Sequence, residues 1–172
     1  DGIADVLIQN GIVTAVGRDL PAAPGTPSLD ATGRLVLPGL IDPQVHFREP
    51  GNEHKEDLAS GSLAALGGGV TSFCEMPNTK PATTDAPLLR DKLRRAEGRA
   101  FVDHAFFVGA TAQNAEQLGD LEQQPGCAGV KVFMGSSTGD LLVPDDATLE
   151  RVLRSGKRRV AVHAEDEPRL RE

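Results

Sequence analysis

The first part of the chain contains two short β-type runs, Ala4–Gln9 and Gly11–Val16, which meet at Asn10-Gly11. Runs rich in Val and Ile are typical of strands, and an Asn-Gly pair favours the positive backbone dihedrals of a tight hairpin turn. A Pro-rich loop follows over Asp19–Asp30. Residues 1–38 are therefore expected to be part of a small β-sandwich-like domain, because a lone hairpin is only marginally stable in water.

From Leu40 onward the pattern changes to β-type runs separated by helical stretches. The repeat is about 30 residues, which is the length of one βα unit. Alternation of this kind predicts a parallel sheet or barrel in an α/β fold. The expected strands are Ile41–Phe47, Val70–Glu75, Val102–Val108, Gly129–Met134 and Val160–Ala164, and the expected helices are Lys55–Leu66, Asp85–Glu97, Asn114–Gln123 and Asp145–Arg154.

The second expected domain, residues 39–172, therefore holds five strands and four helices. A closed (β/α)8 barrel needs about 250 residues. Two α/β architectures fit this pattern: an open domain of five strands, or a partial (β/α)8 barrel with about five of its eight strands. The spacing of the elements leaves both open.

Charge and hydropathy narrow the class of protein. The chain has 18 basic and 25 acidic residues, a net charge of −7, and no basic cluster apart from Lys157-Arg158-Arg159, so we expect no nucleic-acid partner. No apolar run approaches the roughly 18 residues of a membrane span, so we expect no membrane association and a cytoplasmic location. Cys74 and Cys127 are far apart, and we expect both to be free thiols.

Polar residues follow the expected strands. In parallel α/β folds the working residues lie at the carboxyl ends of the strands. With a two-residue period, Gln44, His46 and Arg48 share one face of the first strand, where an imidazole can bind a metal and a guanidinium can pair with a carboxylate. A half-buried strand with a solvated Arg48 is the alternative. The other strand ends are Glu75-Met-Pro-Asn78, Gly109-Ala-Thr111 and His163-Ala-Glu165-Asp166.

Lys131 lies inside an apolar run, where burial would lower the pKa of its amine and favour the neutral form. A neutral lysine can react with carbon dioxide to give a carbamate that bridges two metal ions; a lysine that reaches the strand edge is the alternative. His163 ends another strand, as a ligand or as a hydrogen-bonded core imidazole. Together with His46 these residues suit one or two zinc-type ions, whereas His54 and His104 remain unassigned.

Five motifs occur in the order DPQVHFREPG, EHKED, EMPNTKP, VKVFMGSSTG and VHAEDE. They resemble the dihydroorotase branch of the cyclic amidohydrolases, and more loosely the hydantoinases and allantoinases. The resemblance implies a (β/α)8 barrel, a small β domain assembled from both chain ends, and one or two metal ions in the barrel mouth. It also implies reversible hydrolysis of dihydroorotate to carbamoyl-aspartate in pyrimidine biosynthesis, with a metal-bound hydroxide as nucleophile, and a homo-oligomer.

The resemblance assigns a role to individual residues. His46 matches the second ligand of the first strand's His-x-His motif, Lys131 the carboxylated bridging lysine, and His163 the ligand of the fifth strand. Arg48 and Asn78 match the pair that holds the substrate carboxylate. Because a hydantoin ring offers no such carboxylate, this pair favours a dihydroorotase over a hydantoinase or an allantoinase.

The chain also departs from the family pattern. Gln44 stands where the family has its first histidine, and an amide oxygen is a poorer ligand for a zinc-type ion than an imidazole nitrogen. A second hypothesis is therefore a non-catalytic dihydroorotase-like scaffold, for instance a partner of aspartate carbamoyltransferase. The expected proton-shuttle Asp would lie beyond Glu172 and the family's first strand before Asp1. We therefore expect a segment, inactive alone, of a chain of roughly 400 residues.

Overall fold

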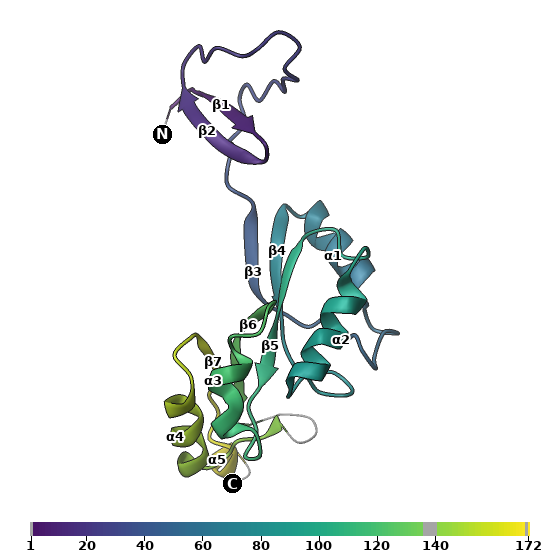
Figure 1. Ribbon diagram of the computed structural model, residues 1–172, viewed down its shortest axis with the longest axis vertical. Helices are drawn as coiled ribbons and strands as arrows, with labels where there is room; N and C mark the ends of the chain where they lie inside the picture. Colours follow the sequence, from purple (N-terminus) through teal and green to yellow (C-terminus); the bar gives the residue numbers. More distant parts are fainter. Residues whose placement is uncertain (1, 136–140, 171) are drawn as a thin grey trace. The chain divides into compact units, whose positions relative to one another are not determined.

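The computed structural model describes residues 2–135, 141–170 and 172. The chain divides into two compact units, Asp1–Leu37 and Pro38–Glu172. Figure 1 shows the elements of each unit along the chain.

The first unit contains a two-stranded antiparallel ribbon formed by β1 (Asp5–Gln9) and β2 (Ile12–Gly17). Asn10 and Gly11 connect the strands and adopt φ values of 52° and 76°. Both values lie in the left-handed region that a type I′ hairpin turn requires, so the Asn-Gly pair explains this turn. The ribbon leaves large apolar side chains such as Ile12 exposed.

The second unit is built on a sheet of five parallel strands that neighbour one another in chain order. Parallel strands in sequential order, with helical crossovers, are the arrangement of a (β/α)8 barrel, and five of its eight strands are present here. The expected fold class is confirmed. The strands are β3 (Leu40–Val45), β4 (Val70–Glu75), β5 (Asp103–Gly109), β6 (Cys127–Phe133) and β7 (Val160–His163).

Aspartate caps begin the three longer helices. In each case the carboxylate accepts a hydrogen bond from the backbone amide three residues later, which satisfies an N–H that has no partner inside the helix. The expected helix over Lys55–Leu66 begins too early, because Asp57 caps it and forms a capping box with Ser60. The helices are α1 (Leu58–Gly67), α2 (Ala86–Ala96) and α4 (Asp146–Ser155), and a short helix α5 (Glu167–Leu170) follows β7.

The helix expected over Asn114–Gln123 is shorter than the sequence pattern suggests. A 3-10 turn, η1 (Ala115–Gln117), leads into one turn of α-helix, α3 (Leu118–Leu121). The side-chain amide of Asn114 donates hydrogen bonds to the carbonyl oxygens of Thr84 and Gly109, at 2.8 and 2.9 Å. Asn114 therefore anchors the loop after β5 instead of starting a regular helix, since its side chain competes for backbone groups.

Alternate residues of the sheet form two hydrophobic clusters. The larger cluster joins strand residues such as Phe73 and Phe106 to helix residues such as Leu89, and it also includes Phe47. The rings of Phe47 and Phe73 meet edge to face with centroids 4.8 Å apart, a favourable aromatic geometry. The smaller cluster is formed by Met76, Phe107 and Ala128. Successive residues of a strand thus pack alternately towards the helices and towards the opposite face of the sheet, which in a closed barrel is the packed interior.

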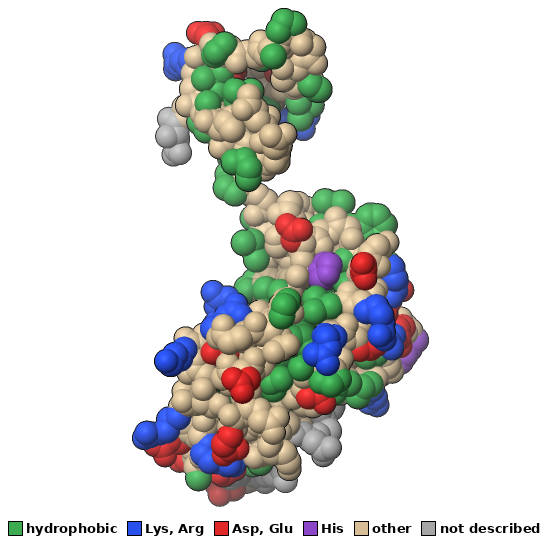
Figure 2. Space-filling model, viewed as in Figure 1, with side chains coloured by type: hydrophobic (Ala, Val, Ile, Leu, Met, Phe, Trp, Pro, Cys, Tyr) green, Lys and Arg blue, Asp and Glu red, His purple; other side chains and the backbone are tan. Residues whose placement is uncertain are grey.

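Within the part of the chain that the structure describes, no helix has both the length and the apolar character needed to cross a membrane. Acidic and basic side chains are interspersed over the visible face of the second unit (Figure 2). Cys74 and Cys127 are both free thiols, as expected.

Candidate functional site

His46 and Asn78 meet at the carboxyl ends of β3 and β4. The Nδ1 atom of His46 lies 2.8 Å from the side-chain oxygen of Asn78. An amide oxygen only accepts hydrogen bonds, so Nδ1 carries the imidazole proton and Nε2 keeps its lone pair. The structure therefore brings together a predicted metal ligand and a predicted substrate-binding residue. It also leaves the Nε2 nitrogen suited to bind a metal.

The electrostatic surroundings of His46 favour the neutral imidazole. Partial burial lowers its pKa below the ordinary value of 6.5, and the nearby cations Arg48, Lys131 and Lys92 lower it further. The hydrogen bond with Asn78 acts in the opposite direction. Since a metal ligand must be unprotonated, this environment prepares His46 for that role.

Arg48 does not share a strand face with His46, contrary to the two-residue period predicted from the sequence. Strand β3 ends at Val45, and Arg48 adopts φ 65° in the left-handed region. This conformation is uncommon for a residue with a Cβ and is often found at functional sites. Gln44 lies within the strand, and its backbone amide donates to Asp42 Oδ1 at 3.0 Å.

A buried carboxylate fixes the loop that carries Arg48. Glu49 accepts hydrogen bonds from both terminal nitrogens of Arg99, Nη1 at 2.6 Å and Nη2 at 3.1 Å. It also accepts one from the backbone amide of Leu58, the first residue of α1, at 3.0 Å. Sequence reasoning missed Glu49, since its partner Arg99 lies 50 residues away and nothing in the local pattern indicates the pair.

A second buried carboxylate supports the loop that carries Asn78. Glu75 Oε2 lies 2.7 Å from Lys92 Nζ, and the two side chains are 0% and 1% exposed. Lys92 also donates a hydrogen bond to the carbonyl oxygen of Met76, at 3.1 Å. Sequence reasoning also missed Lys92. Its position between Leu89 and Ala96 on the apolar stripe of α2 was the available signal of burial.

Lys131 is buried in β6, with 3% of the residue exposed. Burial lowers the pKa of its amine, and no carboxylate among the described residues offsets this effect. Its Nζ lies 4.9 Å from the ring centroid of Phe133. The environment thus favours the neutral amine that reaction with carbon dioxide requires. Residues 136–139 of the motif VKVFMGSSTG lie outside the described residues.

His163 is the last residue of β7, the strand that pairs with β6. Its Nε2 lies 2.8 Å from Glu165 Oε1, and its ring centroid lies 6.1 Å from that of Phe133. Lys131 and His163 thus contact the same phenylalanine ring from neighbouring strands. The described residues hold no group of three or more His, Cys, Asp or Glu side chains arranged to bind a metal. The donor set fits a metal in part, because it offers two imidazoles and a lysine that would become a ligand if it were carboxylated.

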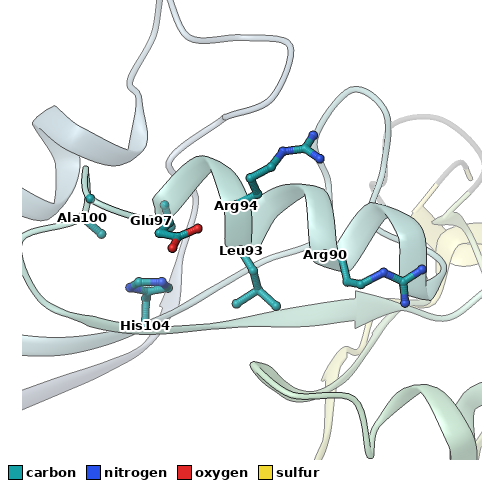
Figure 3. Close-up of a pocket in the computed structure, with 8 residues that line it drawn as sticks. Arg90, Leu93, Arg94, Glu97, Ala100 and His104 are labelled. Atoms are coloured by element: carbon teal, nitrogen blue, oxygen red, sulfur yellow. The ribbon is translucent and has the colours of Figure 1, made fainter.

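The two unassigned histidines lie elsewhere. His54 lies in an exposed turn, and His104 stacks on Phe73 with ring centroids 5.8 Å apart. His104 also lines a shallow pocket of about 640 Å³ along α2, together with Arg90 and Arg94 (Figure 3). The predicted metal ligands and substrate-binding residues do not line this pocket. We therefore place the candidate site at the carboxyl ends of the strands.

Comparison with known proteins gives concordant matches. Residues 33–133 match the model of the family described as dihydro-orotase-like. Over 167 residues the chain is 40% identical to a dihydroorotase from Methanosarcina acetivorans, covering 95% of this chain and 35% of that protein. Over 169 residues it is 40% identical to an allantoinase from Rubrobacter xylanophilus, covering 95% of this chain and 37% of that protein.

A solved structure shows the same fold. An L-hydantoinase (dihydropyrimidinase) from Arthrobacter aurescens matches the chain with a TM-score of 0.82 and 29% identity. The match covers 96% of this chain and 38% of that one. The chain thus spans between 35% and 38% of the length of these three relatives.

Proposed function

Because the chain belongs to the dihydroorotase-like family, we propose that its complete gene product is a metal-dependent cyclic amidohydrolase that opens the dihydroorotate ring to carbamoyl-aspartate. The observation that carries this proposal is the contact between the neutral His46 and Asn78. It joins a metal-ligand candidate to a substrate-binding candidate at the sheet edge where parallel α/β enzymes work. The proposal includes a cytoplasmic role in pyrimidine biosynthesis and a homo-oligomer.

The pair Arg48 and Asn78 suits a substrate that carries a carboxylate, and this favours dihydroorotate over uncharged rings such as hydantoin. Arg48 supplies a cation close enough to lower the pKa of His46, and Asn78 supplies an amide beside the same imidazole. A guanidinium forms charge-assisted hydrogen bonds with a carboxylate, which dihydroorotate carries outside its ring. Hydantoin and allantoin have no carboxylate, so they would leave Arg48 without a counter-charge.

We propose that His46, His163 and carboxylated Lys131 hold one or two zinc-type ions. A bound ion of this kind supplies a Lewis acid and activates water for attack on the ring amide. The chain supplies the donors. His46 offers Nε2, because Asn78 holds the proton at Nδ1. Lys131 forms a carbamate when its neutral amine attacks carbon dioxide, with formation of one N–C bond and loss of one proton.

A substrate panel tests the proposed function. The complete gene product, supplied with zinc, is expected to hydrolyse dihydroorotate with a higher kcat/KM than hydantoin or allantoin. Arg48→Met should raise KM for dihydroorotate by about tenfold or more, the scale of one lost charge-assisted hydrogen bond. Arg94→Met, on an exposed face of α2, is the matched control and should leave KM unchanged. Preference for hydantoin or allantoin would contradict the assignment.

The second candidate function is a non-catalytic scaffold, with aspartate carbamoyltransferase as the proposed partner. Gln44 favours it, since an amide occupies a position where a second imidazole would complete the donor set. The two functions predict different zinc titrations. A hydrolase binds zinc already, and Gln44→His strengthens binding only modestly. A scaffold binds none until Gln44→His is introduced, so full binding by the natural sequence would remove the support for this candidate.

A further inference from the structure

A buried lysine on helix α2 reaches the segment that carries Asn78. Lys92 Nζ donates a hydrogen bond to the carbonyl oxygen of Met76 at 3.1 Å. The same atom lies 2.7 Å from Glu75 Oε2 and 5.2 Å from the ring centroid of Phe106. Lys92 is 1% exposed, so all three contacts are made away from water.

The peptide groups of Met76 are held on both sides. Its backbone amide donates to the carbonyl oxygen of Val45 at 2.9 Å, and its own carbonyl oxygen accepts from Lys92. Val45 immediately precedes His46, and Asn78 follows Met76 by two residues. The 2.8 Å contact between His46 and Asn78 therefore closes a ring that runs through the two chain segments. Lys92 contacts this ring at the carbonyl oxygen of Met76.

Stability alone does not explain this buried pair. Replacing a buried ion pair with apolar side chains of similar volume is often neutral or stabilising, because both charges must be removed from water. Among the described residues, Glu75 Oε1 has no hydrogen-bond partner, although the nearby backbone amide of Phe47 acts to lower the pKa of this carboxyl. Burial raises the pKa of Glu75 and lowers that of Lys92, so the fold maintains the pair against a cost.

We propose that Lys92 is a positioning residue, which holds the Met76 carbonyl so that Asn78 contacts His46 and keeps the imidazole proton on Nδ1. Glu75 supplies the counter-charge that allows a cationic lysine to occupy this place. The inference deepens the proposed function, on which it rests for the roles of His46 and Asn78. The dependence of the contact between His46 and Asn78 on Lys92 can be tested separately.

That test is NMR of the complete gene product labelled with ¹⁵N-histidine, with the His46 signal assigned by its loss in His46→Asn. The readout is the exchange rate of the Nδ1 proton with water. In Lys92→Met this rate should rise by about fivefold to tenfold, the scale of one lost hydrogen bond. Arg94→Met alters the same helix at a side chain that is 76% exposed, and it should leave the rate unchanged.

The double variant Glu75→Gln with Lys92→Met separates positioning from folding. It removes both charges and so leaves neither without a partner. Its Tm should therefore lie closer to that of the natural sequence than the Tm of Lys92→Met does. We expect its Nδ1 proton to exchange as fast as in Lys92→Met, and its KM for dihydroorotate to rise with little change in kcat. A double variant with natural Tm and natural exchange rate would overturn the inference, as would equal acceleration by Arg94→Met.

The exchange measurement needs no turnover. If the complete gene product fails to hydrolyse dihydroorotate, the proposed function fails while the exchange rates still decide the role of Lys92. If hydrolysis occurs but the variants retain the natural exchange rate, the positioning role fails and the proposed function stands.

Discussion

Replacement of Lys131 by methionine should stabilise the metal-free protein and, under the proposed function, lower the amount of zinc that the protein binds. Lys131 is 3% exposed, and its pKa is lowered by burial with no carboxylate of the described residues beside it. Among the described residues this amine has a cation–π contact with the Phe133 ring but no hydrogen-bond partner, and desolvating a polar group without a hydrogen bond costs about 1–3 kcal/mol of stability. Methionine has a similar length, no charge, and a sulfur that packs well against the Phe133 ring. The free energy of unfolding should therefore rise by about 1–3 kcal/mol.

The pH dependence of this gain has a defined sign. The folded pKa of Lys131 lies below its ordinary value of 10.5. Below the folded pKa the amine is charged in both states, and folding bears the full cost of burying it. Between the folded pKa and 10.5 the unfolded state binds more protons, so the stability of the natural sequence rises with pH. The advantage of Lys131→Met should be largest at low pH and shrink as the pH approaches 10.5.

Urea denaturation of the chelator-treated complete gene product measures this difference at several pH values. Lys157→Met, at an exposed lysine, is the matched control and should change stability little. Zinc bound per chain should fall in Lys131→Met and remain unchanged in the control. A metal-free Lys131→Met that is less stable than the natural sequence at every pH would refute the reasoning, because the amine would then have a favourable partner.

Three further predictions concern packing and charge. Gly61→Ala should cost about 1–3 kcal/mol by urea denaturation, because overpacking strains a filled core and the new Cβ would lie 2.5 Å from Phe47 Cδ1; an unchanged midpoint would contradict this packing. Glu49→Gln should cost about 1–2 kcal/mol, since Arg99 is 42% exposed and can be rehydrated; no loss would show that the pair does not hold the loop. Burial raises the pKa of Cys127 above 9.0, so the free energy of unfolding should fall as the pH rises above that value. Cys127→Ala should reduce this fall; an equal dependence of stability on pH in the two proteins would exclude a buried thiol.

Elements with both a periodic pattern and a cap could be predicted from the sequence. The expected helices over Asp85–Glu97 and Asp145–Arg154 form nearly as predicted, because an aspartate cap fixes where each one starts. The helix after β5 could not be predicted, since the Asn114 side chain bonds loop carbonyls and competes with helix formation.

The site was predictable where it depends on strand ends and not where it depends on tertiary contacts. His46 and Asn78 follow adjacent parallel strands, so their meeting follows from the rule that such ends share one edge. The position of Arg48 did not follow, because a period of two assumes extended backbone and the chain leaves that conformation at Arg48. The contact between Glu49 and Arg99 depends on where α2 ends relative to the loop after β3, which local pattern does not encode.

Metal bound per chain tests the central claim most directly. The complete gene product, purified without chelators, should contain about one or two zinc-type ions per chain by plasma mass spectrometry. A ratio near one would show that Gln44 weakens the first metal position while His163 and carboxylated Lys131 hold the second. A ratio near zero, even after zinc is supplied, would contradict a metal-dependent hydrolase and favour the scaffold.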